Sequence, residues 1–274
     1  MRISLVRPVK IVMLGAGGTG AYVAPHVYRL LHVLPRPARF IIADGDTVEE
    51  KNLIRQNFIT SDLGENKAKI LVERYAAAFG VEIEYIPEFI ESDERLAALV
   101  TPDVIRQSYI SGAQFVQGFN PSNPYRNLVI LIAAVDNNKS RQMCHRVFKK
   151  TEELIYIDSG NGKYTGQVVC GVRRKNRTYY KPVGDIYPDV LLETDKFPTE
   201  LSCAEEAMSA PQSIMANIMA ATAIVSYVYN ILALGVIDVR SVTFSSKTVN
   251  MKPAVVQKRS ACANNGAESR PKAA

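Results

Sequence analysis

Hydrophobic and polar positions in the first half of the chain follow two alternating patterns. Short apolar runs at residues 10–14, 39–43 and 128–134 predict strands, and the last run has no polar residue, as expected of a central parallel strand covered on both faces. Between these runs apolar residues recur at helical spacing. The helices predicted here span residues 19–31, 67–79, 93–99 and 139–149. Alternation of strands and helices indicates an α/β fold with a parallel sheet.

The pattern changes in the second half of the chain. After short strands at 82–86 and 154–157, residues 162–172 alternate and contain glycine, which predicts antiparallel strands. Residues 179–202 show no clear period and predict a long crossover loop. A helix at 208–234 and a final strand at 241–245 complete the sheet. We expect a Rossmann-like, three-layer, doubly wound sheet, parallel in the N-terminal half with antiparallel strands added in the C-terminal half.

Length and composition favour one globular domain with a polar terminal segment. The chain has 274 residues, of which 47% are hydrophobic, so it can bury a full core. We expect one domain over residues 1–252, with a nucleotide-binding half at 1–160 and a crossover half at 161–252. Residues 253–274 are basic and poor in apolar residues, which predicts a flexible tail. Such a tail could contact nucleic acid, although a solvated terminus is the more common interpretation of a charge run.

The sequence gives little support to a membrane protein or to a metal-binding protein. The first residues lack the pattern of a signal peptide, and the longest apolar segment, 214–234, is interrupted by Asn217, Ser226 and Asn230. It therefore predicts a buried helix in a cytoplasmic protein. The four cysteines are scattered without a C-x-x-C pair, so no zinc is expected. The three histidines, His26, His32 and His145, stand in predicted helices without a metal-binding pair and are interpreted as structural.

A glycine-rich turn follows the first strand and predicts a phosphate site. The segment Gly15-Ala-Gly17-Gly18-Thr-Gly20 leads from strand to helix, where backbone N–H groups and the helix dipole favour phosphate oxygens. Its spacing satisfies the dinucleotide fingerprint, so an NAD-dependent oxidoreductase is the first hypothesis. Asp44, at the end of the second strand, can hold a ribose hydroxyl in either an NAD or an ATP site.

The charges beyond Asp44 favour a triphosphate over a dinucleotide. Arg55 and Lys67 stand twelve residues apart in the segment that follows. Cations at these positions can offset the charge that develops on a departing pyrophosphate, whereas hydride transfer has no need of them. Asp136 follows the strand 128–134, at the edge of an open α/β sheet where ligands bind. NAD chemistry remains only a distant alternative.

The ordered motifs resemble the ThiF and MoeB adenylyltransferases and the adenylation domains of ubiquitin-activating enzymes. Five motifs appear in that family's order over residues 8–160. They are the glycine turn, Asp-x-Asp-x-Val, Asn-Leu-x-Arg-Gln, Gly-x-x-Lys and a strand ending in Asp-Asn. Within the family the chain looks most similar to the ThiF-related component of bacterial PRTRC systems, especially through Leu201-Ser-Cys203-Ala-Glu-Glu-Ala. The resemblance implies activation of the C-terminal carboxylate of a small ubiquitin-like or sulfur-carrier protein as an acyl adenylate, in a homodimer.

The same resemblance implies ATP and Mg²⁺ as ligands and assigns site residues. Asp136 would bind the magnesium ion and act in catalysis with Arg55 and Lys67, and Arg141 on the next helix would support it. The residues assigned to the nucleotide are Gly15, Gly17, Gly18, Gly20, Asp44, Asn52, Arg55, Gln56, Lys67 and Asn137. Because a carboxylate nucleophile is already ionised at neutral pH, no general base is required.

The sequence leaves alternatives open for the thiol nucleophile and for the arginine that a partner subunit supplies in some relatives. Cys203 precedes the last long helix, where some relatives carry a thioester-forming thiol, but Glu205 and Glu206 oppose a thiolate there. Cys203 is therefore a candidate nucleophile beside a simple packing role. Several relatives supply an arginine to the partner subunit's ATP site from an N-terminal helix that has no clear counterpart here, and Arg2 or Arg7 could replace it. Alternative functions are adenylation of tRNA or a small molecule, and a non-catalytic nucleotide-binding subunit of a plasmid- or phage-associated system.

Overall fold

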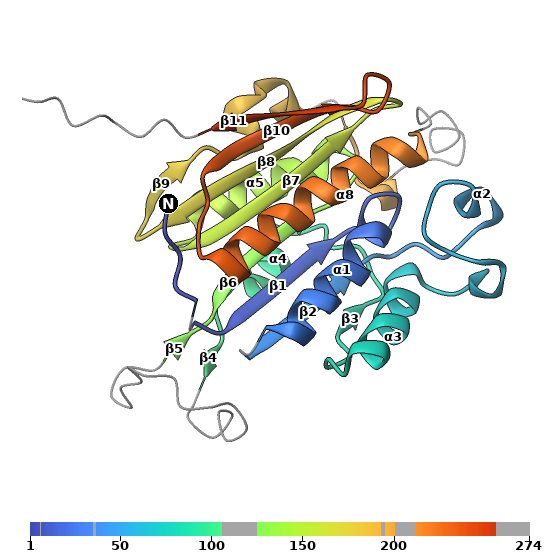
Figure 1. The fold of residues 1–274 in the computed structure, drawn as a ribbon, viewed down its shortest axis with the longest axis horizontal. Coiled ribbons are helices and arrows are strands. Elements are labelled where there is room, and N and C mark those ends of the chain that lie inside the picture. Colours follow the sequence, from blue (N-terminus) through green and yellow to red (C-terminus); the bar gives the residue numbers. More distant parts are fainter. Residues whose placement is uncertain (6, 35–36, 106–124, 193–194, 201–211, 256–274) are drawn as a thin grey trace, which may run out of the picture.

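A mixed β-sheet forms the middle layer of the molecule (Figure 1). The computed structural model describes residues 1–5, 7–34, 37–105, 125–192, 195–200 and 212–255. Within these ranges nine strands form the sheet, in the order β11-β10-β8-β7-β6-β1-β2-β3, with β9 paired to β8. Their bounds are β1 Val9–Leu14, β2 Ala38–Ala43, β3 Tyr85–Ile86, β6 Leu128–Ala133, β7 Leu154–Asn161, β8 Thr165–Arg174, β9 Arg177–Tyr180, β10 Val239–Ser245 and β11 Asn250–Val255. A separate two-stranded pair joins β4 (Val104–Ile105) to β5 (Tyr125–Arg126).

Strand directions confirm the predicted fold class. The neighbours β3, β2, β1, β6 and β7 run parallel, and β8, β10 and β11 are added antiparallel. β9 also pairs antiparallel with β8. The parallel half therefore comes from the first 161 residues, and the antiparallel half from the rest.

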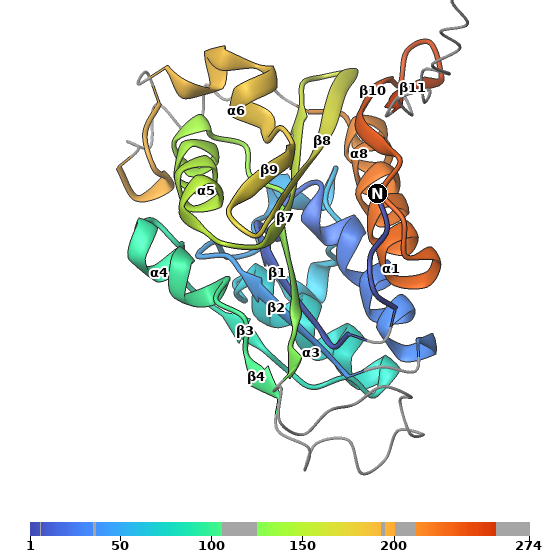
Figure 2. The same ribbon diagram turned by 90° about the vertical axis from the view of Figure 1, so that its left-hand side faces the viewer.

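Helices cover both faces of the sheet (Figure 2). One face carries α1 (Gly20–Val33), α3 (Lys67–Phe79) and α8 (Ile214–Tyr229), and the other carries α4 (Asp93–Leu99), α5 (Asn138–Lys150) and α6 (Val183–Ile186). The short helical segments are α2 Glu50–Leu53, η1 Thr60–Asp62, η3 Pro188–Leu191, η4 Pro198–Glu200 and the π-turn η5 Asn230–Leu234.

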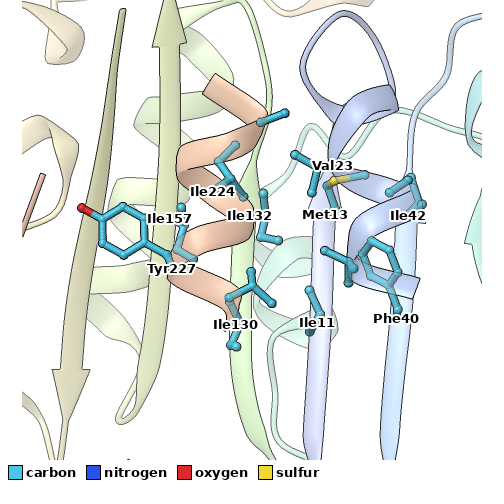
Figure 3. Close-up of a cluster of buried hydrophobic side chains, with 14 of the residues drawn as sticks. Ile11, Met13, Val23, Phe40, Ile42, Ile130, Ile132, Ile157, Ile224 and Tyr227 are labelled. Atoms are coloured by element: carbon cyan, nitrogen blue, oxygen red, sulfur yellow. The ribbon is translucent and has the colours of Figure 1, made fainter. Parts of the chain in front are cut away.

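Two hydrophobic clusters explain the unbroken apolar runs of the central strands. Alternate side chains of a strand point to opposite faces of the sheet. Ile11 and Ile130 accordingly pack under α1 and α8, whereas Val12 and Leu131 pack toward α5. Figure 3 shows Ile11 and Ile130 on the face that Ile224 of α8 covers. Both faces of these strands are buried, and the one charged side chain among the described residues of β1, Lys10, is paired with Asp103.

Capping residues fix the helices whose limits the sequence predicts best. Asn66 caps α3 by accepting a hydrogen bond from Lys69 N at 3.0 Å, and Gly80 ends it in the left-handed conformation (φ 64°). Ser92 caps α4 in the same way through Arg95 N. The observed limits of both helices match the predicted ones.

Three segments differ from the sequence-based expectation. β7 continues to Asn161 because it pairs with β8 over eight residues. β9 lies at the start of the segment predicted as a loop. β11 includes residues 253–255, so the limit set at residue 252 cuts through a strand, and the predicted tail could begin only after it. Residues 256–274 lie outside the described residues.

The helical segment Ile214–Leu234 is long and apolar enough to cross a membrane by length and composition. It has 21 residues with a mean hydropathy of 1.5, but half of the apolar window is buried inside the protein. Ile224, Tyr227 and Val228 of this helix pack on the sheet and on α1. This packing is that of the core helix predicted from the sequence.

The sheet order places ligand-binding loops together. β1 lies between β2 and β6, so the chain leaves β1 toward one side of the sheet and returns on the other. Crevices at the carboxyl ends of such strands are the usual ligand sites of open α/β sheets. The glycine turn follows β1, Asp44 follows β2 and Asp136 follows β6. The three predicted elements therefore share one edge of the sheet, called the carboxyl edge below.

Candidate functional site

The turn between β1 and α1 needs glycine at its two ends. Gly15 has φ +92°, and a Cβ there would lie 2.5 Å from the Ala134 carbonyl oxygen. A Cβ on Gly20 would overlap the Gly15 carbonyl group, whose carbon would be 2.9 Å away. Only glycine allows these backbone approaches. The turn thus delivers the N-terminus of α1 to the carboxyl edge, where its dipole favours an anion.

The two middle glycines differ from the outer pair. Among the described residues other than its chain neighbours, none has an atom closer than 3.9 Å to the place of a Gly17 Cβ, so the space above Gly17 is open there. A Gly18 Cβ would overlap the Asn217 side-chain amide and lie 3.0 Å from Arg55 Nη1. Gly17 is therefore not required by packing within the described chain, whereas Gly18 is covered by side chains from two other elements.

Asp44 ties the glycine turn to the end of β2. Its carboxylate accepts hydrogen bonds from Ala16 N at 2.5 Å and from Asp46 N at 2.8 Å. Burial raises the pKa of the Asp44 carboxyl to about 6, and the Asp46 carboxylate adds to the increase, whereas Lys67 and the two N–H groups oppose it. A buried carboxylate beside the turn is well placed for a ribose hydroxyl.

Lys67 lies buried at the start of α3. Its side chain is 6% exposed, and Nζ forms an ion pair of 2.7 Å with Asp46 Oδ2. Asn66 holds the adjoining loop by donating to the carbonyl oxygens of Asp44 (2.8 Å) and Asp46 (3.1 Å). A buried cation whose one ion-pair partner among the described residues is itself half exposed can also meet an anionic ligand at this edge.

The Asn-Leu-x-Arg-Gln segment combines a structural residue with two that face the turn. Asn52 caps α2, because its Oδ1 accepts from Glu49 N at 2.9 Å. Gln56 is buried, its Oε1 has no partner among the described residues, and its Nε2 lies 3.9 Å from the place of a Gly17 Cβ. Arg55 Nη1 donates to Gln212 Oε1 at 3.4 Å. The buried oxygen of Gln56, without a partner among the described residues, is positioned to accept a hydrogen bond from a polar group beside Gly17.

Asp136 stands exposed in the loop between β6 and α5. No hydrogen bond or ion pair joins its carboxylate to the chain that the structure describes. Asn137 uses its side chain as the cap of α5, accepting from Ser140 N at 2.8 Å. Asp136 can therefore bind a cation or a water, whereas the Asn137 oxygen is already engaged.

Arg141 holds the loop that carries Asp136. Nη2 donates to the carbonyl oxygens of Val135 (2.6 Å) and Ser159 (3.1 Å), and Nε lies 3.5 Å from Asp158 Oδ1. Asp158 follows the strand predicted at 154–157, but the observed strand extends past it. It is fully buried inside β7 and accepts a hydrogen bond from Tyr156 Oη at 2.7 Å. Burial raises its pKa, and Arg141 and Tyr156 counteract the shift.

Four polar residues at the carboxyl edge escape the sequence analysis: Thr19, Asn161, Gln212 and Asn217. Asn161 ends β7 and donates to Asn217 Oδ1 at 2.7 Å, while Thr19 Oγ1 donates to Asn161 Oδ1 at 3.4 Å. Asn217 is 0% exposed although it belongs to the apolar helix α8. A polar residue inside an otherwise buried, charge-free helix is the one sequence signal that could have identified it.

Other candidates fall elsewhere in the chain or outside the described residues. Cys203 lies outside the described residues. Cys144 and Cys170 are buried, and burial raises the pKa of the Cys170 thiol to about 12. The described residues contain no group of His, Cys, Asp and Glu able to hold a metal ion alone. Arg2 forms a backbone bridge with Val236.

Arg7 lies at the opposite edge of the sheet from the glycine turn. Its guanidinium donates to the Arg126 and Asn127 carbonyl oxygens and to Glu153 Oε2 at 2.7–3.0 Å. A cleft of about 810 Å³ opens at this edge, lined by Arg7, Asp93, Lys150 and neighbours. None of the predicted nucleotide residues lines that cleft.

Comparison with known proteins places the chain in a family. Residues 4–264 match the model of the ThiF family. The chain belongs to the ThiF family. No curated protein compared with it matches the sequence.

Solved structures similar to this ThiF-family chain share its fold. PaaA has a TM-score of 0.57 and 17% sequence identity, and the match covers 91% of this chain and 64% of PaaA. E. coli MccB with AMPCPP and MccA has a TM-score of 0.56 and 16% identity, and the match covers 90% of this chain and 63% of MccB. E. coli MccB with ATP is also similar, with a TM-score of 0.55 and 16% identity, and the match covers 93% of this chain and 65% of MccB. The chain spans less than two thirds of the length of each.

Proposed function

We propose that this ThiF-family chain is an ATP-dependent adenylyltransferase that activates the C-terminal carboxylate of a small protein or peptide. One observation carries the proposal: an open glycine turn, a buried carboxylate and two basic side chains share the sheet edge with Asp136, whose carboxylate has no partner among the described residues. The cations are Arg55 and Lys67, and the buried carboxylate is Asp44. An NAD-dependent oxidoreductase would use the glycine turn and Asp44, but its reaction would not require the charges of Arg55, Lys67 and Asp136.

The proposed reaction is a displacement at the α-phosphate of ATP. A carboxylate oxygen of the acceptor forms a bond to the α-phosphorus, and the bond from that phosphorus to the bridging oxygen of pyrophosphate breaks. The products are an acyl adenylate and pyrophosphate. Arg55 and Lys67 would offset the charge that grows on the departing pyrophosphate, and Asp44 would hold the ribose. Catalysis of this kind depends on positioning and charge neutralisation rather than on proton transfer.

Magnesium fits the residues at the carboxyl edge. Mg²⁺ is usually bound by one or two carboxylates together with phosphate oxygens and waters. Asp136 offers an exposed carboxylate without a protein partner among the described residues, which matches a site that phosphates complete. The bound ion would neutralise phosphate charge, and Arg141 would keep Asp136 in place through the Val135 carbonyl.

A ubiquitin-like protein is the acceptor we favour. The motif order that resembles ubiquitin-activating enzymes and the PRTRC component supports it. E. coli MccB, whose fold is similar, has been solved with ATP and with MccA. We propose that in this chain, too, a second polypeptide binds next to the bound ATP. The same proposal includes a second step, in which the Cys203 thiol forms a bond to the acyl carbon, the bond from that carbon to the phosphate oxygen breaks, and AMP leaves.

Pyrophosphate exchange into ATP tests the activity. Purified protein is incubated with ATP, Mg²⁺, labelled pyrophosphate and a small β-grasp protein ending in glycine, if one is encoded beside its gene. Exchange should require the partner, and Asp136→Ala should lower it about a hundredfold. The matched control Glu73→Ala removes an exposed carboxylate from α3 and should leave exchange unchanged. Binding of NADH without binding of ATP would refute the proposal.

We also propose that two copies associate through the outer face of α8. The segment 214–234 has no charged residue, yet Met215, Tyr229 and Leu234 are 45–52% exposed. Exposed apolar side chains on a charge-free helix are compatible with a protein–protein interface, although Thr222 and Ser226 are also exposed along this helix. Light scattering during size exclusion should give a dimer mass, and Met215→Lys should shift it to the monomer.

A further inference from the structure

Side chains from four segments meet over the glycine turn. Asn217 of α8 accepts from Asn161 Nδ2 at 2.7 Å and donates to the Arg55 carbonyl oxygen at 3.5 Å. Gln212, two residues before α8, donates to the Asn161 carbonyl oxygen at 3.2 Å and accepts from Arg55 Nη1 at 3.4 Å. Thr19 joins this group through Asn161. The group links the glycine turn, the segment of Arg55, the end of β7 and the start of α8.

Asn217 is the central member of this group. Its side chain is 0% exposed, and burying an amide is unfavourable unless both its ends find partners. The neighbouring buried residues of α8 are mostly alanine, isoleucine, tyrosine and valine. Stability alone would therefore favour an apolar side chain at this position. An amide here indicates that its hydrogen bonds serve something other than the core.

The contacts of Asn217 point to the phosphate side of the site. A Cβ on Gly18 would overlap its Nδ2, so the amide lies directly against the turn. The same Nδ2 donates to the backbone of Arg55, whose guanidinium also faces Gly18. No contact joins Asn217 to Asp44, the residue assigned to the ribose.

We propose that Asn217 is a positioning residue for the nucleotide phosphates, which makes α8 part of the nucleotide site. This proposal rests on the proposed function, because it takes the nucleotide to be ATP. Asn217 keeps the Gly18 backbone and Arg55 at a fixed separation, so that the turn N–H groups and the guanidinium meet the same phosphate groups. Small displacements of such groups are costly for binding and rate.

The test compares nucleotides that share the ribose but differ in phosphates. Affinities for MgATP and for adenosine are measured by competition with a fluorescent ATP analogue. Asn217→Ala should weaken MgATP binding about tenfold, which corresponds to about 1.4 kcal/mol, and change adenosine binding less than about twofold. Asn217→Asp keeps the acceptor for Asn161 but brings a negative charge to the turn. It should weaken MgATP binding further and again spare adenosine.

Asn127 provides the matched control. It is a buried asparagine, 1% exposed, that bonds to Asp103 at 2.9 and 3.0 Å at the opposite edge of the sheet. Asn127→Ala removes a buried, hydrogen-bonded amide of the same kind, but it should leave the ratio of the two affinities unchanged. Equal weakening of MgATP and adenosine by Asn217→Ala would overturn the positioning role. If the wild-type chain binds MgATP no more tightly than adenosine, the phosphates add no affinity and the proposed function fails as well.

Discussion

Replacing Gly20 by alanine tests the backbone packing of the glycine turn. The new Cβ would overlap the Gly15 carbonyl oxygen and lie 2.9 Å from its carbon, and a carbonyl fixed in a turn cannot rotate away as a side chain can. Gly15 N itself is bonded to the Ala43 carbonyl oxygen at 2.9 Å, so relief of the overlap disturbs β2 as well. We expect Gly20→Ala to be less stable than wild type.

The size of the effect follows from two opposing contributions. Overpacking of this kind costs about 1–3 kcal/mol, and a backbone overlap belongs at the upper end. Alanine in place of glycine at a helix position recovers about 1 kcal/mol. The net loss of about 2 kcal/mol corresponds to a decrease in melting temperature of about 4–8 °C for a chain of this size.

Gly17→Ala is the matched variant in the same turn. In the described part of the chain no residue beyond its sequence neighbours lies within 3.4 Å of the new Cβ, so thermal unfolding followed by circular dichroism should give a melting temperature within about 2 °C of wild type. MgATP affinity should nevertheless fall, because the methyl group occupies the open space above the turn. Equal stability of the two variants, or a more stable Gly20→Ala, would refute this account of the turn.

Two further predictions concern buried carboxyl groups. Because the pKa of Asp44 is raised to about 6, the folded state binds its proton more tightly than the unfolded state does, so stability should fall by about 3 kcal/mol as pH rises from 4 to 7. Urea unfolding at several pH values measures this loss, and Asp44→Asn should abolish that slope; a slope equal to wild type would contradict the assignment. Asp158→Ala leaves Arg141 with an uncompensated charge and should cost about 3–5 kcal/mol in the same assay, whereas a loss below about 1 kcal/mol would mean that the pair contributes little.

The elements that could be predicted from sequence are those with local signals. α3 and α4 begin at side-chain caps, and α3 also ends at a left-handed glycine, so local residues determine their limits. β9 and β11 have no such signal. They are mostly exposed strands that exist because β8 and β10 offer a free edge, and pairing with a distant strand leaves no period in the sequence.

The same distinction applies to the candidate site. The glycine turn, Asp44, Arg55 and Lys67 stand in motifs whose spacing reveals them. Asn217 has no motif around it, because its role depends on α8 crossing over Gly18 from the far end of the chain. The strand predicted at 154–157 stops short of Asp158 for a related reason, since only the pairing with β8 extends β7 beyond that residue.

The central position of β1 has a consequence for how the protein is made. β1 needs β6 as a parallel neighbour, and the face it shares with α1 is closed by Ile224 and Tyr227 of α8 (Figure 3). These partners emerge from the ribosome long after the glycine turn. Contacts so distant in sequence slow folding and leave the first half of the chain exposed to aggregation during synthesis. A fragment ending at residue 160 should therefore collect in inclusion bodies, and nucleotide binding should arise only once α8 has been translated.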